Sequence, residues 1–110
     1  MPVAVEVEGE CLLRPDVQVA LYRIAQEALN NVAKHAGASQ ATVSLRCLPD
    51  RVILRIADNG CGFDPEIVSP EHLGLSIMRE RAEATGAVLT MRSEIGQGTE
   101  VVVEWTVDDG

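Results

Sequence analysis

The stretch that decides the fold begins with a strand-like pattern and closes with a glycine-rich segment: residues 52–63 have the sequence VILRIADNGCGF. In its first half, the apolar residues Val52, Leu54 and Ile56 occupy every second position, which is typical of a half-buried strand. Asp58 then stands at the strand end, where its carboxylate can accept a hydrogen bond from an amino group. Gly60 and Gly62 follow and let a flat ligand approach the backbone, because they carry no Cβ. A two-residue hairpin at Asn59-Gly60 is equally consistent with this stretch.

The size and composition of the chain indicate one soluble globular domain. Its 110 residues correspond to a single domain, and 46% are apolar and 24% charged. Aromatic residues make up 3%, so the core must be aliphatic. No apolar run approaches the roughly 18 residues of a membrane span, so we expect no membrane contact by this domain.

The charge balance excludes a nucleic-acid-binding surface. Seventeen acidic residues against nine basic ones give a net charge of −8, whereas such a surface would be basic. An anionic ligand would therefore need a locally positive pocket. The single lysine, Lys34, is of interest for this reason.

The cysteines predict neither a disulfide framework nor a zinc site. Cys11, Cys47 and Cys61 are odd in number, widely spaced and free of any C-x-x-C pair. A reducing, cytoplasmic setting is expected.

The spacing of the apolar residues predicts two helices on one face of a mixed, mainly antiparallel sheet, that is, a two-layer α/β sandwich of the α+β class. A long helix from about Asp16 to Ala36 carries an apolar stripe and stops near Gly37. A second helix, Leu75 to Thr85, ends at Gly86. The expected strands span residues 3–8, 41–48, 52–57, 88–92 and 100–107, with an irregular segment from about residue 60 to 73.

One face of the long helix could carry chemistry. Glu27, Asn31 and Lys34 are spaced i, i+4 and i+7 and share this face, and His35 follows. A carboxylate can polarise a hydroxyl, an amide oxygen suits Mg²⁺, and an ammonium can neutralise a phosphate. The alternative is a solvated face with one salt bridge.

Two further glycine elements could face a ligand. Gly74-Leu75 opens the second helix, whose free N–H groups suit phosphate oxygens, although an ordinary loop-to-helix junction is the alternative. Gly96-Gln97-Gly98-Thr99 could be a plain turn between strands, or could bring the Thr99 hydroxyl near the ligand of Asp58. No cysteine or carboxylate lies at ligand spacing to His35 or His72, so a metal site made wholly of protein is not expected.

The motifs occur together in the order and approximate spacing of one family. They are Glu27-x-x-x-Asn31-x-x-Lys34-His35, Asp58-x-Gly60-x-Gly62, Gly74-Leu75 and Gly96-x-Gly98-Thr99. Over about residues 10–107 the chain resembles the ATP-binding catalytic domain of bacterial sensor histidine kinases, of the Bergerat fold. Residues 23–36 and 74–82 are similar to those of the nitrate/nitrite-sensor and cell-envelope-sensor subfamily.

The resemblance implies roles at the matching positions. Asp58 would accept a hydrogen bond from the adenine amino group, with Thr99 assisting through water. Asn31 would ligate Mg²⁺ between the phosphates, and Lys34 would contact phosphate. Glu27 would act near the γ-phosphate as general base or metal-organising residue. The other positions expected to contact or flank the nucleotide are His35, Gly60, Gly62, Gly74, Leu75, Gly96 and Gly98, with a short ATP lid at about residues 64–73.

The resemblance also implies an activity. Residues 1–110 would be a single ATP-binding catalytic domain that donates the γ-phosphate to a histidine on a separate dimerisation domain, with a response regulator as an indirect partner. The chain would be a fragment of a larger kinase that binds ATP but does not autophosphorylate by itself. The alternatives are an anti-sigma-factor serine kinase on the same fold and a non-catalytic interaction module with a decayed site.

Overall fold

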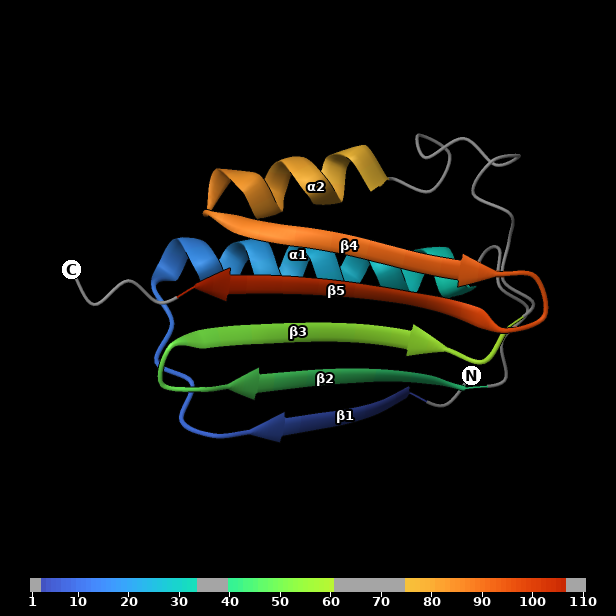
Figure 1. The fold of residues 1–110 in the computed structure, drawn as a ribbon, viewed down its shortest axis with the longest axis horizontal. Helices are drawn as coiled ribbons and strands as arrows, with labels where there is room; N and C mark the ends of the chain where they lie inside the picture. The colour runs from blue at the N-terminus through green and yellow to red at the C-terminus, as the bar shows by residue number, and fades with distance from the viewer. Residues whose placement is uncertain (1–2, 34–39, 61–74, 107–110) are drawn as a thin grey trace.

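The computed structural model describes residues 3–33, 40–60 and 75–106 of the chain. Its elements follow one another in the order β1 (Val3–Glu8), α1 (Pro15–Asn31), β2 (Ala41–Cys47), β3 (Arg51–Asp58), α2 (Leu75–Ala84), β4 (Ala87–Glu94) and β5 (Gly98–Thr106). The strands form one sheet in the order β1-β2-β3-β5-β4, with β1 parallel to β2 and the other neighbours antiparallel (Figure 1). The predicted mixed, mainly antiparallel sheet is confirmed.

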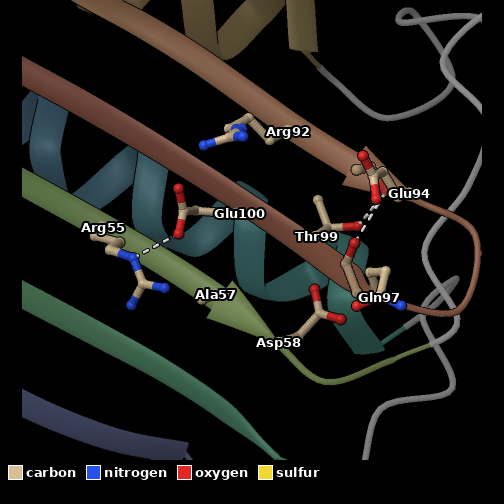
Figure 2. A pocket seen from close by; sticks show the side chains of 10 residues that line it. Arg55, Ala57, Asp58, Arg92, Glu94, Gln97, Thr99 and Glu100 are labelled. Atoms are coloured by element: carbon tan, nitrogen blue, oxygen red, sulfur yellow. Dashed lines mark hydrogen bonds and ion pairs between the residues drawn. The ribbon is translucent and has the colours of Figure 1, made fainter.

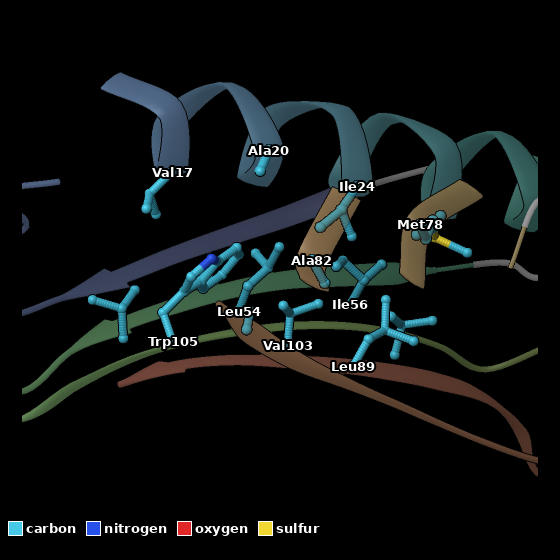
Figure 3. Close-up of a cluster of buried hydrophobic side chains, with 14 residues drawn as sticks. Val17, Ala20, Ile24, Leu54, Ile56, Met78, Ala82, Leu89, Val103 and Trp105 are labelled. Atoms are coloured by element: carbon cyan, nitrogen blue, oxygen red, sulfur yellow. The ribbon is translucent and has the colours of Figure 1, made fainter. Parts of the chain in front are cut away.

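Both described helices cover the same face of the sheet and bury an aliphatic core against it (Figure 3). The largest fully buried side chains come from both layers: Ile24 on α1, Met78 on α2, and Leu54, Ile56 and Val103 on β3 and β5. Alternate strand residues point to this core because successive side chains of a strand lie on opposite faces. The two-layer α/β arrangement expected from the periodicity is therefore confirmed.

The apolar stripe of α1 decides how this helix packs. The predicted positions Val17, Ile24, Ala28 and Val32 are buried, and Leu21 is half-buried. Pro15 begins the helix, a position that suits its fixed φ angle and missing N–H. The α-helical part ends at Asn31 and is followed by a wider helical turn at residues 32–33, while the predicted helix end at Ala36 and the stop at Gly37 lie outside the described residues.

The β4–β5 hairpin is longer than the sequence predicted. Its pairing continues beyond residues 88–92 and 100–107 as far as Glu94 and Gly98, which face each other next to the turn at residues 95–97. The turn is closed by the Gln97 N–H, which donates to the Glu94 carbonyl at 3.0 Å. The predicted Ile95–Gly98 turn is confirmed.

The hairpin alternative at Asn59-Gly60 is wrong. β3 pairs with β2 along one edge and with β5 along the other, so neither edge is available to a strand that follows Gly60. The expected lid at residues 64–73 and Cys61 lie outside the described residues.

The expectation that the cysteines stay unpaired is also wrong. Cys11 and Cys47 form a disulfide across 36 residues of sequence, with their Cα atoms 5.3 Å apart. The connection from β1 to α1 passes the end of β2, so close that a Cβ on Gly9 would overlap the carbonyl oxygen of Cys47. Spacing along the chain could not reveal this proximity, because it arises from the parallel pairing of β1 with β2.

The face of the sheet opposite the helices, called here the outer face, carries ion pairs between β3 and β5. Arg55 Nε lies 2.7 Å from Glu100 Oε2, and Arg51 lies 3.4 Å from Glu104 across the same strand pair. Among the described residues, no helix has the length and apolar character that a membrane crossing requires.

Candidate functional site

Three elements, α1, β3 and β5, bring the site residues that the structure describes to one end of the sheet. Val32, just after α1, packs against Ala41 at the start of β2. Ala41 is in register with Asp58, the last residue of β3. On the other side of Asp58 lies Gly98, the first residue of β5. α2 also begins at this end (Figure 1), so residues far apart in sequence converge there.

Asp58 is half-buried, and its carboxylate is held in place by the chain that follows. The Gly60 N–H donates to Asp58 Oδ1 at 2.8 Å. Among the described residues, Oδ2 has no such donor. An ionised carboxylate only accepts hydrogen bonds, so Asp58 can receive an amino N–H from a ligand at this oxygen.

Asn59 fixes the end of β3 against the residue that precedes β2, a role that its sequence context did not predict. Its N–H donates to the Gln40 carbonyl at 3.2 Å, and the Gln40 N–H donates to Asn59 Oδ1 at 3.0 Å. These reciprocal hydrogen bonds keep Asp58 and Gly60 in position.

The two glycines of the β4–β5 turn serve different purposes. Gly98 has a φ of +86° and lies so close to β3 that a Cβ would overlap the Asp58 carbonyl oxygen. Gly96 has a φ of +83°, but no atom lies within 4 Å of the place that a Cβ would occupy, so only the turn itself requires it. Gly98 is thus directly at the site, and Gly96 shapes the turn beside it.

Thr99 is half-buried on β5 and is held from β4. Its Oγ1 lies 2.9 Å from the Oγ of Ser93, with which it is in register. Ser93 was not predicted as a site residue. Its position could have indicated one, because it is a polar residue at the fourth inward position of β4, after Ala87, Leu89 and Met91.

Glu27 and Asn31 lie on the last turns of α1 and are both half-buried. Their i, i+4 spacing places a carboxylate and an amide oxygen one turn apart on the same helix face. The part of the chain that the structure describes holds no group of three His, Cys, Asp or Glu residues that could bind a metal by itself.

A hollow of about 260 Å³ adjoins the site and reaches it from the outer face (Figure 2). It shares Asp58, Gly98 and Thr99 with the candidate site. The rest of its lining includes Arg55 and Arg92, which point away from the helices, so the hollow lies on the side opposite Glu27 and Asn31.

The remaining predicted positions are only partly within the described chain. Leu75 begins α2, as expected, and Gly60 is buried next to Asp58. Lys34, His35, Gly62 and Gly74 lie outside the described residues, so their roles stay predictions.

The arrangement of these residues can be compared with known proteins. Residues 16–109 match the family described as histidine kinase-, DNA gyrase B- and HSP90-like ATPases. The chain belongs to this family. Among relatives of this ATPase domain, the histidine-protein kinase/phosphatase DegS of Bacillus subtilis is 39% identical over 95 residues, which cover 84% of the chain and 25% of DegS. The nitrate/nitrite sensor protein NarX of Escherichia coli is 37% identical over 103 residues, which cover 93% of the chain and 17% of NarX.

Solved structures show the same fold for this ATPase domain. Full-length ShkA, solved in complex with AMPPNP, superimposes with a TM-score of 0.77 at 24% identity, over 94% of this chain and 25% of ShkA. The histidine kinase domain of the blue-light activated kinase of Erythrobacter litoralis EL346 gives 0.72 at 23% identity, over 93% of this chain and 50% of that domain. The predicted kinship with sensor histidine kinases, including the nitrate/nitrite type, is confirmed, and the chain spans a quarter or less of the length of DegS and NarX.

Proposed function

We propose that this domain binds ATP with Mg²⁺ and donates the γ-phosphate to a histidine on a separate dimerisation domain, as part of cytoplasmic two-component signalling. The observation that carries the proposal is the convergence at one end of the sheet. Asp58 and Thr99, whose side chains suit a nucleotide base, lie at this end. The end of α1 lies there too, and its residues Glu27 and Asn31 suit phosphates and a cation. The relatedness to DegS and NarX supports a kinase of this class.

The base half of the site depends on Asp58. Its Oδ1 accepts from the Gly60 N–H, which leaves Oδ2 for the amino group of adenine. Gly98 keeps β5 close to the same residue. Gly60 and Gly62 carry no Cβ and would therefore let a flat ring approach the backbone.

The phosphate half depends on α1 and the residues after it. Mg²⁺ takes oxygen ligands in octahedral geometry and usually keeps phosphate and water ligands, so the side chains of Asn31 and Glu27 would be suitable ligands for it by type. The bound ion would neutralise charge on the phosphates. Glu27 would orient the γ-phosphate, and Lys34 would neutralise part of its negative charge. The residues expected to border the triphosphate are His35, Gly74, Leu75 and Gly96. Catalysis of this kind consists mainly of positioning and charge neutralisation.

Asp58→Asn should weaken ATP binding about 10- to 100-fold. The substitution replaces a charged acceptor with an amide, and hydrogen bonds to charged groups contribute roughly 1.5–3 kcal/mol. Calorimetric titration of the domain with ATP and Mg²⁺ measures the change. Asp50→Asn is the matched control, because it makes the same chemical change in the exposed turn between β2 and β3. Equal affinities for Asp58→Asn and Asp50→Asn would remove Asp58 from the base site.

Phosphoryl transfer should require a second domain. We expect no labelling of the chain alone by γ-labelled ATP with Mg²⁺, and labelling of an added helical dimerisation domain that carries a histidine. Acid-labile phosphohistidine on that domain is the expected product, and at limiting ATP concentration Asp58→Asn should form less of it. Acid-stable phosphoserine on a protein substrate would instead indicate the serine kinase alternative.

A further inference from the structure

Ser93 is the one polar side chain that is buried among the described residues, at 9% exposure. It lies on the inward face of β4, opposite Thr99 on β5. Its Oγ lies 3.3 Å from the carbonyl oxygen of Gly98 and 2.9 Å from Thr99 Oγ1. Ser93 therefore contacts two consecutive residues of the candidate site from a neighbouring strand, without lying at the end of β3 itself.

The protons of these two hydroxyl groups can be assigned. A carbonyl oxygen only accepts hydrogen bonds, so Ser93 donates its proton to Gly98. A serine hydroxyl has a single proton, so the contact with Thr99 is made by the proton of Thr99, which donates to Ser93 Oγ. Thr99 Oγ1 is left with lone pairs and acts as an acceptor for anything else that approaches it.

We propose that Ser93 is a positioning residue that fixes the Thr99 hydroxyl as a hydrogen-bond acceptor and thereby favours a 6-amino over a 6-oxo purine. The inference rests on the proposed nucleotide site. Asp58 and Thr99 are the next residues beyond the Ala57–Glu100 pair of β3 and β5, so they lie beside each other (Figure 2), and the Asp58 carboxylate is a hydrogen-bond acceptor as well. Two fixed acceptors suit a base edge that donates N–H, directly or through a water molecule. A keto oxygen at that position would meet acceptors and no donor.

Removal of the Ser93 hydroxyl frees the Thr99 hydroxyl to rotate. In Ser93→Ala, Thr99 can present its proton to the ligand, and the preference for an amino group becomes weaker. We expect ATP affinity to fall about three- to tenfold, as for the loss of one neutral hydrogen bond. The affinity for inosine triphosphate, which carries the 6-oxo group, should fall less or rise. The ratio of the two dissociation constants should therefore shrink.

The experiment is a calorimetric titration of wild type, Ser93→Ala, Ser93→Thr, Thr99→Val and the double variant Ser93→Ala/Thr99→Val with each nucleotide and Mg²⁺. Ser93→Thr keeps the hydroxyl and should restore most of the ATP preference. The double variant should lose no more than Thr99→Val, because Ser93 acts through Thr99. A purely structural role would weaken both nucleotides by the same factor. Melting temperatures are compared first, and Ser93→Cys, which keeps the side-chain shape, replaces Ser93→Ala if that variant is unfolded.

The outcomes separate two failures. An unchanged ratio in Ser93→Ala, or additive losses in the double variant, would overturn the role of Ser93 while wild type still binds ATP. A wild-type domain that binds neither nucleotide would overturn the proposed function, and the Ser93 proposal with it.

Discussion

Gly98→Ala is expected to destabilise the domain by about 4 kcal/mol. Two costs combine at this residue. An alanine in the left-handed region costs about 1–2 kcal/mol, and Gly98 has a φ of +86°. The added Cβ would also overlap the carbonyl oxygen of Asp58, which is backbone and cannot swing aside as a flexible side chain could. Relief requires β5 to move away from β3, and overpacking of this kind costs about 1–3 kcal/mol.

Gly96→Ala is a matched control for this prediction. Gly96 has nearly the same φ, +83°, two residues earlier in the same turn, but nothing lies within 4 Å of its added Cβ. The expected loss is therefore only the conformational term of about 1–2 kcal/mol. Urea unfolding of both variants gives the comparison. Equal losses would contradict the assigned contact between Gly98 and Asp58.

The change in ATP affinity should follow the change in packing between β5 and β3. Because Gly98 presses against the residue proposed to bind adenine, Gly98→Ala should also weaken ATP binding, whereas Gly96→Ala should leave it close to wild type. This difference separates the two glycines, which the sequence motif alone treats as equivalent.

Much of the fold could be predicted because local patterns and tertiary packing agree. The alternation in β3 and β5 and the stripe on α1 each place their apolar residues towards the core that the structure shows. The strand ends were less predictable: pairing between β4 and β5 runs to Glu94 and Gly98, past the apolar residues, because backbone hydrogen bonds extend to the turn whatever the side chains. The order β1-β2-β3-β5-β4 depends on pairings between distant segments, which periodicity does not encode.

The candidate site was predictable in its residue types and less so in its supports. Asp58 and Thr99 stand out because each belongs to a glycine motif that is typical of ligand sites. Ser93 and Gln40 act through neighbours on other strands, and those neighbours are known only once the register Ser93–Thr99 and the Asn59–Gln40 hydrogen bonds are seen. The Cys11–Cys47 pair was invisible for the same reason, and it leads to a second large effect.

Reduction of the Cys11–Cys47 disulfide should lower the free energy of unfolding by about 4 kcal/mol. The bond closes a loop of 36 residues, and the chain-entropy estimate for a loop of this length gives about 4 kcal/mol. For a domain of this size the loss corresponds to a fall in melting temperature of about 15 °C. Thermal unfolding with and without dithiothreitol measures it, and Cys47→Ser should reproduce the reduced value without the reductant.

The same reduction should leave ATP affinity nearly unchanged, because the bond and the candidate site lie at opposite ends of β2. Cys47 is in register with Val52 at one end, and Ala41 with Asp58 at the other. For the melting comparison, Cys61→Ser is the control, since it removes a thiol and keeps the disulfide. In a cytoplasmic setting, where disulfides are rare and often redox-sensing, stability would then follow the redox state while nucleotide binding would not. Identical melting with and without dithiothreitol, or three titratable thiols in the unreduced, unfolded protein, would contradict the bond.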